Sequence, residues 1–171
     1  MTKRFVFVSL ALLASPAMGQ DYAAPFDFSM QATDTCLARA GDSGADPAAC
    51  FTKAAENCME INEGGFSNVG AGRCYRLELK AWDRRLNDAY QVLLEDAARR
   101  DADMDSYGTQ APRQVPALRQ TQRAWIAYRD AKCDYVYSLW EGGTGGGPAS
   151  SECLLRETAH QALALQDFLQ E

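Results

Sequence analysis

Six cysteines and a single histidine, His160, limit the chemistry open to this 171-residue chain. Structural zinc sites favour cysteines about two to four residues apart, and no two cysteines here are that close. An even number of cysteines in an exported chain is typical of disulfide bonds. We therefore expect three bridges and no zinc. The cysteines are Cys36, Cys50, Cys58, Cys74, Cys133 and Cys153.

The first four cysteines can pair in more than one way. Cys50 and Cys58 fall two turns apart on one expected helix, a distance of about 12 Å. That distance is too long for a disulfide, which excludes the nested arrangement. Pairing in chain order, Cys36–Cys50 and Cys58–Cys74, is favoured, because each bridge then joins neighbouring helices. The crossed arrangement, Cys36–Cys58 with Cys50–Cys74, remains open.

The last two cysteines, Cys133 and Cys153, flank a glycine-rich stretch, "EGGTGGGPAS", at 141–150. A bridge between them closes a loop and joins two expected helices. In the chain-entropy model, closing a loop of about 20 residues contributes roughly 3 kcal/mol to stability.

Catalytic constellations are missing from the sequence. With His160 as the only histidine, neither a Ser–His–Asp triad nor a multi-histidine metal site can be assembled. The acidic run "DADMD" at 101–105 lacks the full calcium-loop pattern and is expected to be a solvated turn. No isolated pair of carboxylates suggests glycoside hydrolysis. We expect no enzyme activity, no metal and no cofactor.

The N-terminal residues have the layout of a secretory signal peptide. Lys3 and Arg4 precede an apolar run at 5–14, and small residues follow up to an expected cleavage before Gln20. The apolar run is too short to span a bilayer. We therefore expect a signal peptide over 1–19, a mobile leader over 20–28 and one domain over 29–171, in the periplasm or secreted, with no membrane span after cleavage.

The charge of the chain restricts its partners. The net charge of the whole sequence is −6, and removing Lys3 and Arg4 with the signal peptide leaves about −8. An acidic protein is a poor ligand for nucleic acid, which needs basic patches. Attraction to a basic protein is possible, although the acidity can also serve solubility alone.

Helical periodicity runs through the chain, and no period-two alternation indicates a strand. Helices are expected over about 29–40, 46–61, 72–100, 113–140 and 150–170. The longest has an apolar stripe at steps of four and three, formed by Tyr75, Leu79, Trp82, Leu86, Ala89, Leu93 and Ala97. We expect an all-α fold, a small disulfide-stapled helical bundle built on a long antiparallel helical hairpin.

Arg129 lies on the apolar face of the fourth expected helix, together with Gln122. If the third and fourth helices pack antiparallel across the 101–112 connection, Arg129 falls opposite Asp83 or Arg84, and Asp83 is the candidate partner. A guanidinium can hold a carboxylate through two parallel hydrogen bonds, whereas a buried charge without a partner is costly. We therefore predict a structural ion pair, Arg129–Asp83, in preference to a ligand site.

Three segments together resemble the domain family of the lysozyme inhibitor LprI. They are "CYRLELKAWDRRLNDAYQVLL" (74–94), "LRQTQRAWIAYRDAKC" (118–133) and, after a glycine-rich loop, "CLLRETAHQALALQDFL" (153–169). The resemblance covers about 58–169. It departs from the family in the last helix, where members often carry an arginine after the residue matching Thr158. The matching residues are Cys74, Asp83, Leu86, Asn87, Tyr90, Gln122, Arg123, Trp125, Tyr128, Arg129, Asp130, Cys133, Gly142, Gly143 and Cys153.

The resemblance implies an exported envelope protein that inhibits or binds a basic lysozyme by protein–protein contact. Two glycine-rich loops are candidates for that contact, 63–72 and 141–147. The second contributes Gly142, Gly143, Thr144, Gly145, Gly146 and Gly147 as a candidate binding loop. The competing interpretations are that the loops are plain connections and that the chain is a structural or stress-related periplasmic protein without a lysozyme target.

Overall fold

The structure is a computed structural model that describes residues 25–108 and 110–170. Every regular element in those residues is helical, which confirms the all-α prediction. The expected signal peptide and the first part of the expected leader lie outside the described residues. The elements are α1 (Gln31–Ser43), the 3-10 turn η1 (Pro47–Cys50), α2 (Lys53–Ile61), α3 (Asn68–Ser106), α4 (Gln114–Ser138) and α5 (Gly146–Phe168).

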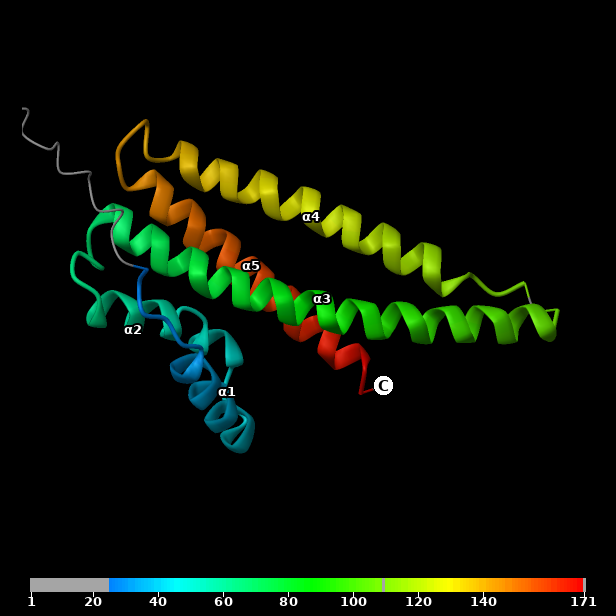
Figure 1. Cartoon of the computed structure of the whole chain (residues 1–171). Coiled ribbons are helices and arrows are strands. Elements are labelled where there is room, and N and C mark those ends of the chain that lie inside the picture. The colour runs from blue at the N-terminus through cyan, green and yellow to red at the C-terminus, as the bar shows by residue number, and fades with distance from the viewer. Residues whose placement is uncertain (1–24, 109, 171) are drawn as a thin grey trace, which may run out of the picture.

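Three long helices form the body of the molecule (Figure 1). α3 and α4 run antiparallel, as expected for the hairpin, but the closest partner of α3 is α5. The shared core joins Trp82 and Leu86 of α3 to Leu155 and Leu165 of α5, all of which are buried. The ring of Phe51 packs edge-on against the ring of Trp82 in this core, with the two ring centroids 5.4 Å apart. The main apolar contact is therefore between α3 and α5, and α4 lies at the edge of the bundle.

α4 is joined to α5 by covalent and polar contacts more than by burial. Within α4, whose residues are all described, Cys133 alone is buried. Lys132 Nζ bonds Glu157 Oε1 of α5 at 2.6 Å, and this hydrogen bond raises the pKa of Lys132. Gln122 Oε1 accepts a hydrogen bond from Gln161 Nε2 of α5 at 3.2 Å. These contacts fix the position of α4 over α5.

The three disulfides join the cysteines in chain order. Cys36–Cys50 connects α1 to η1, Cys58–Cys74 connects α2 to α3, and Cys133–Cys153 connects α4 to α5. The crossed arrangement is not adopted. Each bridge joins consecutive elements, and Cys58–Cys74 and Cys133–Cys153 each close one of the two glycine-rich loops.

The expected helix over 46–61 is divided in two. Asp46 caps a short 3-10 turn, accepting a hydrogen bond from the Ala48 amide at 2.9 Å. Thr52 then takes a left-handed conformation with φ 79°, and α2 begins at Lys53. A β-branched residue at positive φ is strained and persists only where surrounding contacts hold it. The Thr52 hydroxyl supplies one such contact, a 2.9 Å hydrogen bond to Glu56.

The acidic run 101–105 forms the last turns of α3 and caps the next helix. The carboxylate of Asp101 accepts hydrogen bonds from the Gln114 and Val115 amides at 2.7 and 3.0 Å. Desolvation opposes ionisation of Asp101, but these two hydrogen bonds and the charge of Arg113 lower its pKa overall. The acidic run, which was predicted to be a solvated turn, is instead helical, and its Asp101 caps the N-terminus of α4. No described helix is long and apolar enough to cross a membrane.

Candidate functional site

The predicted ion pair between Arg129 and Asp83 is wrong. Arg129 instead bonds its neighbour Asp130 through Nε and Nη2 at 2.9 and 2.8 Å, and its guanidinium stacks over Trp125 at 4.9 Å. Asp83 is exposed and accepts a hydrogen bond from Asn87 at 3.1 Å. The physical reason is the position of α4: because its apolar face is directed largely at α5, Arg129 does not meet Asp83 on α3.

Arg129→Ala is therefore expected to lower the free energy of unfolding by only about 1 kcal/mol. An ion pair with an exposed carboxylate contributes about 0–1 kcal/mol, and a partly exposed cation–π contact contributes a similar amount. Urea denaturation of the two proteins measures the difference. A loss of about 3 kcal/mol or more, the cost of breaking a buried pair, would contradict this assignment.

Among the described residues, the buried ionisable side chain is that of Glu78, which sequence reasoning missed. Its side chain is fully buried and accepts hydrogen bonds from the Thr33 hydroxyl at 2.7 Å, the Ala55 amide at 2.7 Å and the Trp82 indole at 3.3 Å. Burial raises the pKa of Glu78, although these hydrogen bonds act in the opposite direction. The only sequence signal was its position four residues before Trp82, on the core side of α3.

Glu78 has a structural role. The Thr33 hydroxyl that donates to Glu78 also accepts a hydrogen bond from the Ala54 amide at 2.9 Å. Glu78 and Thr33 thus connect α1, the first turn of α2 and α3. The Glu78 carboxylate accepts from the Ala55 amide and the Thr33 hydroxyl accepts from the Ala54 amide, two amides at the N-terminus of α2 that have no partner within the helix. Among the described residues, no group of three or more His, Cys, Asp or Glu side chains could hold a metal ion.

Both glycine-rich loops lie at the same end of the bundle, where α3 begins and α4 passes into α5 (Figure 1). Asn68 Nδ2, at the start of α3, donates a hydrogen bond to Thr144 Oγ1 of the second loop at 2.7 Å. Gly72 faces Pro148, and a Cβ at Gly72 would lie 3.6 Å from the Pro148 Cα. The two loops therefore form one surface. We call this surface the loop end and define it as residues 61–69 and 139–144.

The second loop is a packed turn, and only part of the expected segment is free. Gly145 and Gly146 are buried. The Trp140 ring fills the place that a Cβ of Gly145 would need. Gly146 and Gly147 already belong to the first turn of α5. Gly142, Gly143 and Thr144 are the exposed remainder, and Gly142 needs its positive φ of 85° for the reversal.

The first loop presents apolar side chains to solvent. Phe66 is 73% exposed and Val69 is 80% exposed. The loop is held tightly beneath them, since a Cβ at Gly65 would collide with the Met59 carbonyl and one at Gly70 with the Gly64 carbonyl. Sequence reasoning identified this loop by its glycines and did not single out Phe66 and Val69. They are the most exposed apolar residues of the loop end, which also exposes Ile61, Leu139 and Trp140.

The loop end also carries acidic side chains. Glu63 in the first loop and Glu141 in the second loop are exposed. Neither of them has an ion-pair partner within the described part of the chain. The loop end therefore combines protruding apolar groups with unpaired negative charge, which suits contact with a basic protein surface.

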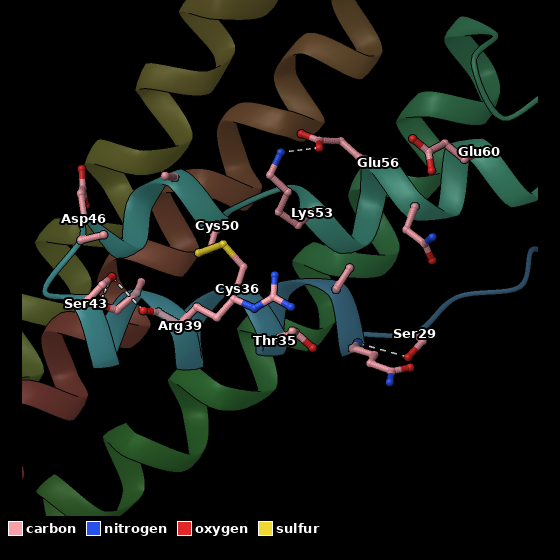
Figure 2. Close-up of a pocket in the computed structure, with 16 residues that line it drawn as sticks. Ser29, Thr35, Cys36, Arg39, Ser43, Asp46, Cys50, Lys53, Glu56 and Glu60 are labelled. Atoms are coloured by element: carbon pink, nitrogen blue, oxygen red, sulfur yellow. Dashed lines mark hydrogen bonds and ion pairs between the residues drawn. A yellow bond between two sulfur atoms is a disulfide. The ribbon is translucent and has the colours of Figure 1, made fainter.

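A groove lies apart from the loop end, between α1 and the η1–α2 segment (Figure 2). The Cys36–Cys50 disulfide crosses it, and its walls carry side chains of both charges, among them Arg39 and Glu60. Lys53 on the same wall is already paired with Glu56 at 2.7 Å. Because side chains of both charges line the groove and Lys53 is already paired, the groove has no preference for one kind of ligand.

These features define a class: a small all-α protein, closed by three disulfides, that presents two anchored loops at one end of a helical bundle. The family model described as Lysozyme inhibitor LprI matches residues 58–165, and the chain belongs to this family. The match begins at Cys58, so α1, η1 and the first disulfide precede it.

A relative among curated proteins is an uncharacterized protein of Rhizobium meliloti (strain 1021). It is 26% identical over 104 residues, which covers 61% of this chain and 75% of the relative. Comparison with solved structures gives no significant match.

Proposed function

We propose that this protein is an exported inhibitor of a basic lysozyme and that it acts by protein–protein contact through the loop end. Membership of the lysozyme inhibitor LprI family supports the target class. One observation supports the choice of site: the Asn68–Thr144 hydrogen bond joins the two loops, and a disulfide anchors each of them. Inhibition by binding requires no catalytic group, in keeping with the absence of a triad from the sequence.

Charge supports the choice of partner. The net charge of the whole chain is −6, and cleavage of a signal peptide makes the mature chain more acidic. Lysozymes of the animal type are basic, so the two proteins attract each other over a distance comparable to the Debye length. Such attraction raises the rate of association, and close contacts then determine the lifetime of the complex.

The anchored loops support tight contact. Ordering a mobile loop on binding costs free energy, and a loop already fixed by a disulfide and by packing avoids most of that cost. Phe66 protrudes from such a fixed loop, and aromatic side chains that fill a pocket on a partner contribute strongly to binding. The layout of residues 1–19 and the three disulfides support an oxidising compartment outside the cytoplasm.

A turbidity assay tests the proposal. Lysozyme clears a suspension of bacterial cell walls, and the purified mature chain is expected to slow the clearing in proportion to the lysozyme bound. Rising ionic strength is expected to weaken the effect, because salt screens the attraction between the two proteins. Clearing at an unchanged rate with excess protein would favour the competing interpretation, an envelope protein without a lysozyme target.

A further inference from the structure

The chain just before α1 is packed against the bundle, beside α2 and the first part of α3 (Figure 1). Phe26 and Phe28 are half-buried, whereas Asp27 between them is exposed. Both rings pack on a second, smaller core that buried residues of α2 and α3 form. The end of a chain keeps one position where contacts tie it down, and two packed rings are such contacts. We call residues 26–28 the strap.

Polar contacts tie the strap to the end of α2. The Asp27 amide donates a hydrogen bond to Asn62 Oδ1, and Asn62 Nδ2 donates one to the Asp27 carbonyl, both at 2.9 Å. Asn62 Nδ2 also donates to the Cys58 carbonyl in the last turn of α2 at 2.8 Å. The guanidinium of Arg73 on α3 lies over the Phe26 ring, 4.4 Å from its centroid. The strap is therefore attached to both helices that flank the first loop.

Asn62 is also the residue at which the first loop begins. Its carbonyl accepts a hydrogen bond from the Gly65 amide at 3.0 Å, and the Gly64 carbonyl accepts one from the Ser67 amide at the same distance. These two turns present Phe66 to solvent. Because the side chain of Asn62 holds the strap and its carbonyl holds the first turn of the loop, strap and loop are connected through this residue.

We infer that the strap positions the first loop: it fixes Asn62 at the entry of the loop and so keeps Phe66 in the conformation that contacts lysozyme. The contact with lysozyme rests on the proposed function of the loop end, whereas the fixing of the loop does not. A loop already held in its bound conformation avoids part of the ordering cost of binding. The strap precedes the residues that the family model matches, 58–165, so this device lies outside the matched part of the chain.

A double variant of the strap, Phe26→Ala with Phe28→Ala, tests the inference in the free protein. Hydrogen exchange followed by NMR is expected to show the Gly65 and Ser67 amides exchanging at least about tenfold faster, because the loop opens more often. The amides of α5, which packs on the larger core, are expected to keep their protection. Leucine at both positions retains apolar packing and is expected to restore most of the protection.

Inhibition of lysozyme gives the second measurement on the same variant. The alanine variant is expected to inhibit about fivefold more weakly, since a loop that spends only about a fifth of its time in the bound conformation binds about fivefold more weakly. The variant with leucine at both positions is expected to inhibit nearly as well as the wild type.

Leu93→Ala with Leu118→Ala is the matched control. These two leucines are also half-buried, but they pack on the larger core. Their removal is expected to lower the overall stability without a selective change in the exchange of the Gly65 and Ser67 amides.

A milder pair of variants isolates the hydrogen bond of Asp27. Asp27→Pro keeps both rings but removes the amide hydrogen that Asn62 Oδ1 accepts, and the Gly65 amide is expected to exchange about threefold faster. Asp27→Ala keeps this amide hydrogen and removes only an exposed carboxylate, so it is expected to leave the exchange unchanged.

Two results would overturn the inference: Gly65 and Ser67 amides that exchange no faster in the alanine variant of the strap than in the leucine control, or a loosened loop that inhibits as well as the wild type does. A wild type that does not inhibit lysozyme would contradict the proposed function instead, and the exchange of the free protein would still decide whether the strap fixes the loop.

Discussion

Glu78→Ala is expected to lower the free energy of unfolding by about 3 kcal/mol. The substitution removes the acceptor of three buried donors: the Thr33 hydroxyl, the Ala55 amide and the Trp82 indole. Each buried donor left without a partner costs about 1–3 kcal/mol, and relief from burying a carboxylate offsets part of the sum. The expected loss is a large fraction of the total stability of a domain. Urea denaturation, with the disulfides intact, measures it.

Two further variants make this result specific. Glu78→Gln keeps the size of the side chain but replaces one acceptor oxygen by an amide group that faces a donor, so a loss of about 1–2 kcal/mol is expected. Glu95→Ala removes an exposed carboxylate from the same helix and is expected to be nearly neutral. If Glu78→Ala were as mild as Glu95→Ala, the three-way junction at Glu78 would not hold the helices together.

The pH dependence of Glu78 has a defined sign. Burial raises the pKa of its carboxyl in the folded protein above the ordinary value of 4.5. The folded state therefore takes up the proton first as the pH falls, so the contribution of Glu78 is most favourable near and below pH 4.5. It declines as the pH rises through the folded-state pKa. The stability of the wild type relative to Glu78→Gln is thus expected to increase between neutral pH and pH 4.5.

A double variant of the first loop, Phe66→Ala with Val69→Ala, is expected to weaken inhibition of lysozyme at least about thirtyfold. Both side chains are largely exposed, so their removal costs the free protein little. In a complex, an aromatic anchor and an adjacent aliphatic group commonly contribute 2 kcal/mol or more together, which corresponds to that factor. The concentration that halves the rate of cell-wall clearing gives the comparison.

Phe168→Ala is the control for this variant. Phe168 is another exposed phenylalanine, at 55%, but it lies at the C-terminal end of α5, the end of this helix that is away from the loops (Figure 1). The substitution is expected to leave inhibition unchanged. Equal inhibition by the wild type and by the loop variant would place the contact elsewhere, even if the protein is an inhibitor.

Local patterns in the sequence were sufficient to predict much of the fold. The steps of four and three from Tyr75 to Ala97 predicted the buried face of α3, where Trp82 and Leu86 form the core. The prediction that Cys50 and Cys58 do not bridge is confirmed, although its premise of one continuous helix is not, since the two cysteines lie in η1 and α2. These predictions depend on residues near one another in the chain, where geometry is fixed by the helix itself.

Features that depend on which helices pack against one another could not be predicted in the same way. Assigning Arg129 to Asp83 assumed that α3 packs most closely on α4, whereas its closest partner is α5. The bend at Thr52 and the burial of Glu78 arise from one junction of α1, α2 and α3. Similarly, the glycines at 142–147 suggested a free loop, but the burial of Gly145 under Trp140 requires a conformation that no local pattern specifies.

Hydrogen exchange of the mature chain mixed with a basic lysozyme tests the central claim most directly. The proposal predicts that amides in 61–69 and 139–144 exchange more slowly in the complex, while those of α1 do not change. Slowing of exchange confined to the α1–α2 groove, or no change anywhere at saturating lysozyme, would contradict the assignment of the loop end as the inhibitory surface.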